Sequence, residues 1–343
     1  MQNTDSESLV FLLCQDRELS TTFPSIEKNL LTPLSAGLGL FGTKSGQSEG
    51  IQYEMDWARP EPEDWAMELM ATGVDLEAWV HAANIHPQFL PGIPIPGSPP
   101  PPAPGKGSGA IIFFWRYLLG KKLLAELNSL KAEWFAITRS DFLWRLPHPP
   151  LANLDPSQVY FLDGERYGGV SDRHVLFHRD LAEPVLTVCH DLFEETRQVV
   201  SRYGHLDFIN PEVFLFHEWS RLGVMERAVF LPYPCFSVRS EGAPSKGQHG
   251  LYNRDLGMYV KYGDEELQSR VFSFFLRNPS SWGRFPAGGP PLGLVIGRAV
   301  WRSVLTYSRQ KKWIRYRSRF ARIWLRKLVR RMVRRLKGTG EEN

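Results

Sequence analysis

The feature that most limits the fold is a short apolar run followed at once by a segment of helical spacing. Residues 8 to 16 (SLVFLLCQD) predict a buried strand, and residues 21 to 34 repeat apolar side chains at helical intervals. A second short apolar run, GLGLF, follows at residues 37 to 41. A strand, a helix and a strand in this order are typical of a parallel α/β sheet.

The chain continues this pattern beyond residue 109. We expect further strands at WFAIT (134–138), QVYFL (158–162), AVFLP (228–232) and FSVR (236–239), and helices at 110–133, 181–204 and 210–223. The last helix has Asn210 as its N-cap and Gly223 as its stop signal. The sequence predicts an α/β fold with a mostly parallel, Rossmann-like sheet flanked by helices.

The stretch from about residue 43 to 108 has a different composition. Gly and Ser come first, then an acidic section with Trp57, Trp65 and Trp79, then a proline-rich run from Pro91. Proline-rich segments favour polyproline II conformation, so we expect a surface insertion within a domain of residues 1–297. The tryptophans could stack on sugars, but aromatic side chains at helical spacing more often belong to a core.

The charge of the chain is concentrated at its C-terminal end. Residues 298 to 343 carry 16 Lys and Arg against two Glu, so this segment contributes +14 to a net charge of +4, and residues 1–297 contribute −10. Large apolar side chains recur every three or four residues among these cations. The pattern predicts a basic amphipathic helix over 298–337 that lies on an anionic membrane surface through residues 309–337.

Two other uses of this tail are open to such a sequence. The helix could pack on the domain with a solvated basic face, or it could bind nucleic acid. We do not expect nucleic acid as a partner, because the acidic body would repel a polyanion. The N-terminus lacks a basic region, the apolar runs are short, and the three cysteines form no framework. We therefore expect a cytoplasmic protein, peripheral at the inner face of the membrane.

Charged residues follow several of the predicted strands. Arg139 and Asp141 come directly after WFAIT, Arg17 follows the first strand, and Arg239 ends FSVR. Ligands of open parallel sheets bind outside the carboxyl ends of the strands, so these arginines could together bind an anion such as a diphosphate. The alternative for Arg139 and Asp141 is a local ion pair or a loop cap.

A second charged cluster lies in DGERYGGVSDRHV, residues 163 to 175. Gly168 and Gly169 allow the backbone to approach a ligand closely, and Asp172, Arg173 and His174 follow as an acid, a guanidinium and an imidazole. The alternative is a glycine-containing turn with solvated charges.

The order of these motifs resembles that of the GT-A-like glycosyltransferases of bacterial and algal surface-polysaccharide type. The resemblance runs from Ser8 to Arg239 through the first strand with Q-x-R, then PSIEKNLLTPL, TRSDFLW, DGERYGGVSDRH, NPEVFLF and FSVR. It implies a GT-A-like catalytic domain that moves a sugar from a nucleotide-diphosphate-sugar to a glycan or lipid-linked acceptor.

The resemblance also implies roles for the charged residues. Asp141 would hold Mn²⁺ or Mg²⁺ on the donor diphosphate, although this chain has R-S-D where many GT-A enzymes have D-x-D. Asp172 would act as the base for the acceptor hydroxyl, with Glu212 as its rival and His174 as the group that orients it. The further donor-binding candidates are Arg17, Arg139, Gly168, Gly169, Arg173 and Arg239.

A different class of function is compatible with the same residues. The chain could be a non-catalytic membrane-associated scaffold or carbohydrate-binding protein built on a degenerate transferase domain. Loss of the metal site would favour this alternative.

Overall fold

The structure is a computed structural model, and it describes residues 6–93, 95, 97, 108–163, 167–240 and 251–275. The chain divides into two compact units, Met1–Leu294 and Val295–Asn343. The second unit and the predicted amphipathic helix over 298–337 lie outside the described residues.

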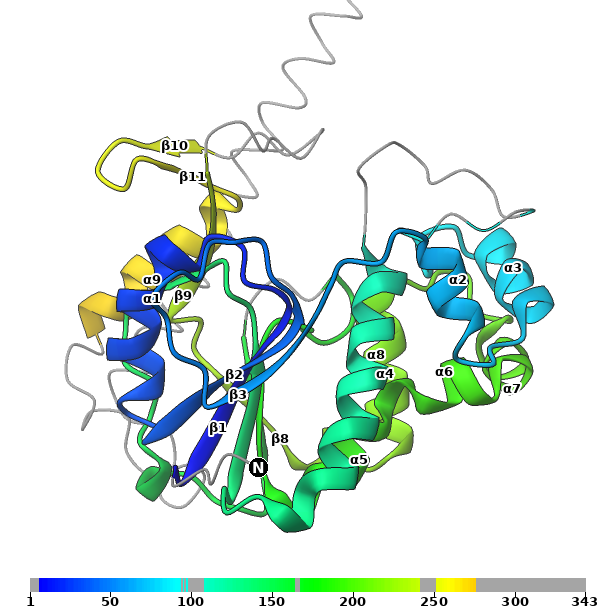
Figure 1. Ribbon diagram of the computed structural model, residues 1–343, viewed down its shortest axis with the longest axis horizontal. Coiled ribbons are helices and arrows are strands. Elements are labelled where there is room, and N and C mark those ends of the chain that lie inside the picture. Colours follow the sequence, from blue (N-terminus) through cyan, green and yellow to red (C-terminus); the bar gives the residue numbers. More distant parts are fainter. Residues whose placement is uncertain are drawn as a thin grey trace, which may run out of the picture. The chain divides into compact units, whose positions relative to one another are not determined.

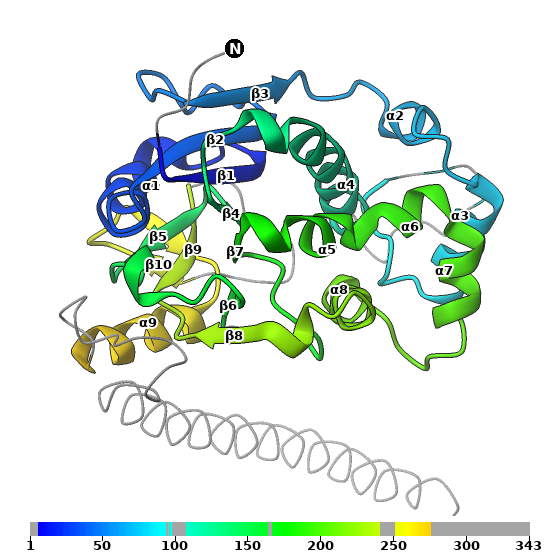
Figure 2. The same ribbon diagram turned by 90° about the horizontal axis from the view of Figure 1, so that it is seen from below.

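A seven-stranded sheet forms the centre of this unit (Figures 1 and 2). Its order is β3 (Met55–Arg59), β2 (Ala36–Thr43), β1 (Ser8–Gln15), β4 (Trp134–Thr138), β7 (Val175–His178), β6 (Val159–Leu162) and β8 (Ala228–Leu231). Six strands run parallel, and β7 runs antiparallel to both of its neighbours. The predicted α/β fold with a mostly parallel sheet flanked by helices is confirmed.

Strand β1 shows why the sheet is covered on both faces. Its residues Leu9 to Leu12 are each 0% exposed, although successive side chains of a strand point to opposite faces. Leu9 and Phe11 belong to the large core cluster shared with α4, so the even-numbered side chains are buried on the other face. A continuous apolar run rather than an alternating one is what a parallel strand between two layers requires.

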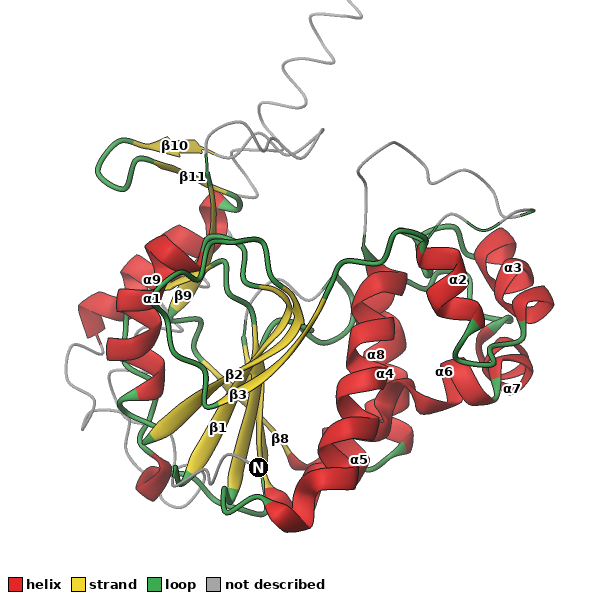
Figure 3. Cartoon of the chain, in the orientation of Figure 1, coloured by secondary structure: helices red, strands yellow, loops and turns green. Residues whose placement is uncertain are grey.

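Helices lie on both faces of the sheet (Figures 2 and 3). Figure 2 shows α1, which a π-helical turn (Glu27–Leu31) extends, on one face and α4, α5 and α8 on the other. The helices are α1 (Leu19–Ile26), α2 (Trp65–Met70), α3 (Leu76–Ile85), α4 (Gly109–Glu126), α5 (Ala182–Leu186), α6 (His190–Glu194), α7 (Thr196–Tyr203), α8 (Pro211–Arg221) and α9 (Gly263–Phe275).

A second, smaller sheet packs beside the carboxyl end of β4. Its order is β10 (Leu251–Asn253), β11 (Met258–Val260), β9 (Cys235–Arg239) and β5 (Phe142–Trp144), with every pair antiparallel. The N–H of Val238 donates to the carbonyl of Asp141 at 2.9 Å, so the turn that ends β4 is bonded to this second sheet.

The stretch predicted to be a surface insertion differs in part from expectation. Residues 55–59 form β3 at the edge of the main sheet, and residues 65–85 form α2 and α3. Trp79 is 1% exposed and Leu69 is fully buried. Asp64 and Asp75 cap the two helices, accepting from backbone N–H groups of the first turns. These residues therefore contribute to the core rather than to a surface loop.

The segment predicted as one helix over 181–204 is broken into three. A 3₁₀ turn at Thr187–Cys189 separates α5 from α6, and Glu195, with φ −135°, separates α6 from α7. The Thr187 hydroxyl donates to the carbonyl of Glu183 at 2.8 Å, a side-chain bond that competes with regular helix geometry. The spacing of apolar residues is compatible with a single helix, but the 3₁₀ turn and the backbone conformation of Glu195 divide the segment.

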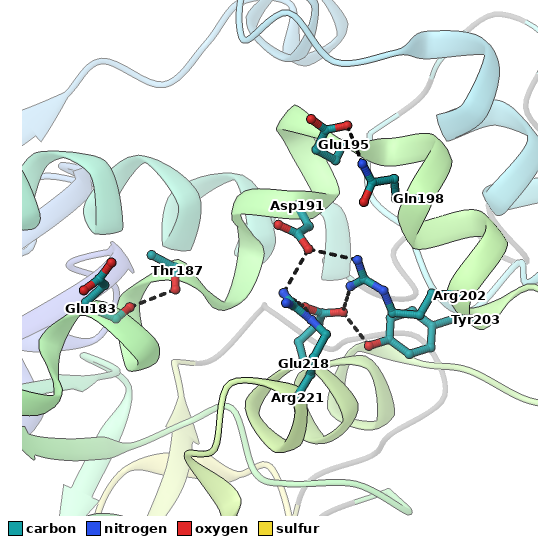
Figure 4. A network of polar contacts seen from close by, with 9 residues as sticks. All are labelled: Glu183, Thr187, Asp191, Glu195, Gln198, Arg202, Tyr203, Glu218 and Arg221. Carbon is teal, nitrogen blue, oxygen red and sulfur yellow. Dashed lines mark hydrogen bonds and ion pairs between the residues drawn. The ribbon is translucent and has the colours of Figure 1, made fainter.

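An ionic network ties these short helices to α8 (Figure 4). The Glu218 carboxylate is 0% exposed and accepts from Arg202 at 2.5 Å, from Arg221 at 2.7 Å and from the Tyr203 hydroxyl. The two arginines also donate to Asp191, at 3.0 and 2.9 Å. The buried Glu218 carboxylate is thus both hydrogen-bonded and paired with opposite charge, which is the condition under which a buried carboxylate is tolerated.

Candidate functional site

The turn after β1 is held in an unusual backbone conformation. Cys14, near the end of β1, has φ 81°, and Glu18, in the turn that follows, has φ 60°; both lie in the left-handed region that non-glycine residues seldom adopt. Ser240 donates to the Glu18 carboxylate through its N–H at 2.9 Å and its hydroxyl at 3.0 Å. Such conformations persist only where the surroundings enforce them, and they cluster at functional sites. Arg17 lies in the middle of this fixed turn.

The turn after β4 is tied to the turn after β1. The Ser140 hydroxyl donates to the carbonyl of Gln15 at 2.7 Å, and the Thr22 hydroxyl donates to the carbonyl of Ser140 at 2.6 Å. Because β1 and β4 are adjacent and parallel, their carboxyl ends meet at one edge of the sheet. Arg17, Arg139 and Asp141 are therefore brought to the same edge, as the sequence predicts.

Arg139 and Asp141 form a bidentate ion pair at this edge. Arg139 Nε donates to Asp141 Oδ1 at 2.8 Å, and a terminal nitrogen donates to Oδ2 at 2.7 Å. Burial disfavours ionisation of Asp141, but Arg139, and beyond it Lys261 and Arg239, outweigh it and lower its pKa to about 2. Asp141 is thus a carboxylate at every physiological pH.

Two further cations come from the second sheet. Arg239 ends β9, and Lys261 follows β11, which pairs with β9 so that Tyr259 lies opposite Arg239. The Lys261 N–H donates to the Ser237 carbonyl at 2.9 Å, which fixes the chain at this point. Sequence reasoning identified Arg239 and missed Lys261. The signal that could have found it is the position of Lys261 at the end of the apolar strand MYV.

These cations act on one another through their charges. Burial lowers the pKa of Arg239, and the charges of Arg17 and Arg139 add to this effect. Burial likewise lowers the pKa of Lys261, with Arg139 and Arg239 adding to it. We call Arg17, Arg139, Arg239 and Lys261 the cation cluster. Like charges crowded together in this way are typical of sites that bind an anion.

Asp172 reaches the same edge from β7. Because β7 is antiparallel, the residues that precede it lie beside the carboxyl ends of β1 and β4. The backbone carbonyl of Asp172 accepts from Arg116, and its half-buried carboxylate raises the pKa of Arg139. Among the residues that the structure describes, no hydrogen bond reaches this carboxylate. It is therefore available to accept a proton or a hydrogen bond from a ligand.

Arg173 has a structural environment rather than a ligand-facing one. The residue is 5% exposed. Its guanidinium pairs with Glu265 of α9, donates to the Tyr233 hydroxyl at 3.2 Å and lies 4.6 Å from the Tyr262 ring centroid. These contacts anchor α9 beside the site. One terminal nitrogen of the guanidinium already donates to Glu265 and Tyr233, which does not favour a contact with the donor. The predicted role of Arg173 in donor binding stays a prediction.

His174 is buried and has no acidic partner within the described ranges. Its ring is 0% exposed and packs 5.4 Å from the Trp144 ring and 5.6 Å from the His148 ring, measured between centroids. Neither ring nitrogen is hydrogen-bonded to any described residue. Burial, with the neighbouring charge of His148, holds the pKa of His174 well below its usual range. The geometry gives no support to the predicted orientation of Asp172 by His174, because no bond joins them.

Gly168 and Gly169 are explained by their contact with α8. A side chain at Gly169 would place its Cβ 2.0 Å from the carbonyl oxygen of Glu212, and Gly168 has φ +93°. The N–H of Val170 donates to the same carbonyl at 3.1 Å. The glycines thus permit a close approach of two backbones. Glu212 lies in the first turn of α8, where Asn210 is the N-cap as predicted.

The residues of this edge do not fit a divalent metal site as they are arranged. Both oxygens of Asp141 accept from Arg139, and its side chain is 3% exposed. Of the residues that the structure describes, no three His, Cys, Asp or Glu come together as a possible metal site. Mn²⁺ and Mg²⁺ prefer several oxygen ligands, and here one carboxylate is already neutralised by a guanidinium.

A separate cavity of about 720 Å³ lies between the edge of the main sheet and two helices. Its wall comes from β2, β3, the α2 region and α4, and includes Phe41, Trp57, Arg59, Phe114, Tyr117 and Lys122. Lys122 lies 4.8 Å from the Trp57 ring centroid and 2.5 Å from the Glu126 carboxylate. None of the residues of the cation cluster lines this cavity.

Two further findings concern membrane-spanning helices and the comparison of this chain with known proteins. Within the described ranges, no helix is long and apolar enough to cross a membrane. A scan of protein-family models and a search of curated proteins each return no match to this chain.

Proposed function

We propose that this chain is a GT-A-like glycosyltransferase that binds a nucleotide-diphosphate-sugar at the carboxyl ends of β1 and β4. The observation that carries the proposal is the cation cluster, whose members come from four separate segments: Arg139, Arg239 and Lys261 act on Asp141 through their charges, and Arg17 acts on Arg239. A mostly parallel sheet with its charged residues at the carboxyl edge is compatible with such a site.

The chemistry of transfer explains why the cations are needed. The bond between the anomeric carbon and the diphosphate oxygen breaks, and a bond forms from the acceptor hydroxyl oxygen to that carbon. Negative charge develops on the leaving diphosphate, and preorganised guanidinium and ammonium groups stabilise that charge. Arg17, Arg139, Arg239 and Lys261 would supply this stabilisation.

Asp172 is the candidate base for the acceptor hydroxyl. Its carboxylate is half-buried, lies within the influence of Arg139 and has no hydrogen bond from a described residue. In a transfer that inverts the anomeric carbon, it would take the proton of the attacking hydroxyl. Glu212 is the alternative base, and the acceptor is a glycan or a lipid-linked glycan. Binding of an anionic membrane through residues 309–337 stays a prediction.

The test is the release of nucleoside diphosphate from UDP- and GDP-sugars by the full chain, measured with Mn²⁺ and with EDTA. We expect wild-type protein to release it, and Asp172→Asn to be slower by a factor on the order of 10² to 10⁴ while still binding UDP or GDP. If the folded protein neither binds nor cleaves any donor in either buffer, the proposal is wrong.

A second candidate function is a non-catalytic scaffold or carbohydrate-binding protein. The observation that favours it is the Arg139–Asp141 pair, in which both oxygens of Asp141, the residue predicted to hold a metal on the donor, already accept from Arg139. Tight binding of UDP or GDP without any release of sugar would support this candidate.

A further inference from the structure

We propose that Lys261 and the three arginines of the cation cluster neutralise the donor diphosphate in place of a divalent metal, so that the diphosphate binds without Mn²⁺ or Mg²⁺. The inference rests on the proposed function, because it concerns the same site. It assigns Lys261, which was not among the residues predicted from the sequence, as a residue that contacts the diphosphate.

The first observation is the state of Asp141. Both of its oxygens accept from Arg139, so the carboxylate orients a guanidinium instead of offering lone pairs to a metal. A pair of this kind fixes the plane of the guanidinium, so its N–H groups that do not bond to Asp141 point away from that carboxylate. The side chain of Arg139 is 27% exposed while that of Asp141 is 3% exposed, so the cation and not the carboxylate faces outward.

The second observation is an excess of positive charge. Four cations form the cluster, and within the described part of the chain the carboxylates that act on its members are Asp141 and Asp172. The Nε–H of Arg239 is buried and has no hydrogen-bond partner among the described residues. A buried donor without a partner is unfavourable unless a ligand supplies the acceptor. A diphosphate would provide both the missing charge and the missing acceptor.

The third observation is the way Lys261 is held. Its half-buried side chain lies 4.8 Å from the Tyr262 ring centroid, and the backbone is pinned by the bond from its N–H to Ser237. Burial together with the charges of Arg139 and Arg239 lowers the pKa of its ammonium group. Its ammonium group interacts with the Tyr262 side chain and feels the charge of Asp141, but no ion pair joins it to a carboxylate among the described residues. Strand pairing places this lysine among arginines, so it is positioned for an anionic ligand.

The experiment is calorimetric titration of inorganic pyrophosphate, the part common to every nucleoside diphosphate, into the full chain in EDTA and again with Mn²⁺. The variants are Lys261→Gln, Lys261→Arg and Asp141→Asn. Lys122→Gln is the matched control, since the basic tail also attracts anions and this variant loses the same charge outside the cluster.

We expect pyrophosphate to bind as tightly in EDTA as with Mn²⁺. Lys261→Gln should weaken binding about 10- to 100-fold, the effect of one hydrogen bond between charged groups, while Lys261→Arg keeps most of the affinity. Asp141→Asn should still bind pyrophosphate in EDTA, because the four cations remain and no metal held by Asp141 is needed. Lys122→Gln should behave as wild type.

Three results would overturn the inference: binding only with Mn²⁺, loss of binding in a folded Asp141→Asn variant, or equal affinities of Lys261→Gln and Lys122→Gln. If Asp141→Asn does not fold, as judged by circular dichroism, the two lysine variants decide. Donor cleavage that requires Mn²⁺ would sink this inference and leave the proposed function standing. Metal-free pyrophosphate binding without cleavage of any donor would do the reverse.

Discussion

Arg139 and Asp141 meet side by side, with two parallel hydrogen bonds of 2.8 and 2.7 Å between the guanidinium and the carboxylate. The two residues are only two positions apart, so the turn after β4 brings them together without help from a distant segment. The buried carboxylate is thereby neutralised locally. Either partner alone would leave an unmatched charge at the edge of the sheet.

Removal of this carboxylate should destabilise the fold. We expect Asp141→Ala to lower the free energy of unfolding by about 3 kcal/mol, because Arg139 then keeps a partly buried charge without its partner. The double variant Arg139→Leu/Asp141→Leu should lose less than the sum of the two single leucine variants. Urea unfolding measures both, and strictly additive losses would contradict a coupled pair.

The Arg139–Asp141 pair should also make the free energy of unfolding depend on pH in acid. The pKa of Asp141 is lowered from 3.8 to about 2 in the folded state, so its contribution to stability is present above about pH 4 and is lost as the pH falls towards 2. The stability difference between wild type and Asp141→Asn should shrink over this interval. Urea titrations at closely spaced pH values would reveal it, and a difference that stays constant to pH 2 would argue against the pair.

The buried histidines should make the fold sensitive to milder acid. Burial lowers the pKa of His148 to about 4 and that of His174 well below its usual range, while both protonate near pH 6.5 in the unfolded chain. Folding stability should therefore fall as the pH drops from 6.5 to 4, by up to about 1.4 kcal/mol per pH unit for each histidine. His174→Phe, which keeps a ring beside Trp144, should reduce this slope relative to wild type.

The network around Glu218 predicts a loss of stability without a loss of ligand binding. Glu218→Gln keeps a hydrogen-bond acceptor for Tyr203 but removes the charge that faces Arg202 and Arg221 (Figure 4). We expect the unfolding free energy to fall by about 3 kcal/mol. Pyrophosphate affinity should not change, because none of these residues belongs to the cation cluster.

Glu195 offers the control for that variant. It accepts from Gln198 at 3.0 Å on the exposed surface of the same region. Glu195→Gln should change stability by no more than about 0.5 kcal/mol. Equal effects at the two positions would mean that the Glu218 network contributes nothing beyond surface charge.

The close approach at Gly169 should make even a methyl group harmful. Gly169→Ala puts a Cβ 2.0 Å from a carbonyl oxygen of α8, which requires the two backbones to separate. We expect a loss of about 3 kcal/mol, at the upper end for overpacking. Gly223→Ala, with φ +73° and no atom within 4 Å of the new Cβ, should lose only the conformational part of about 1 kcal/mol. Thermal melting of both variants compares the two effects.

Elements with several agreeing local signals were predicted well from the sequence. WFAIT is a continuous apolar run between polar residues, and β4 has the predicted bounds. Helix α8 has an N-cap, a proline at its start and a glycine after its end. The strand β7 and the helix α9 were not predicted, because four residues of apolar sequence and a charged amphipathic segment give no clear pattern alone.

The candidate site was predictable where it follows from chain direction. Arg17, Arg139 and Asp141 follow parallel strands, so their meeting at one edge requires only the order of elements. Lys261 joins them through the pairing of β11 with β9, which sequence spacing does not encode. The environment of His174 depends on Trp144 and His148, which come from another part of the chain. Such tertiary contacts override what a motif indicates.

The cluster takes its cations from two sheets, and this has a consequence for motion. An anion held by Arg17 and Arg139 from one sheet and by Arg239 and Lys261 from the other would act as a cross-link between them. Local opening of the β9–β11 pair would then require release of the anion, so the backbone amides of this pair should exchange their hydrogens more slowly when it is bound. The local stability of the small sheet would then depend on whether an anion occupies the site.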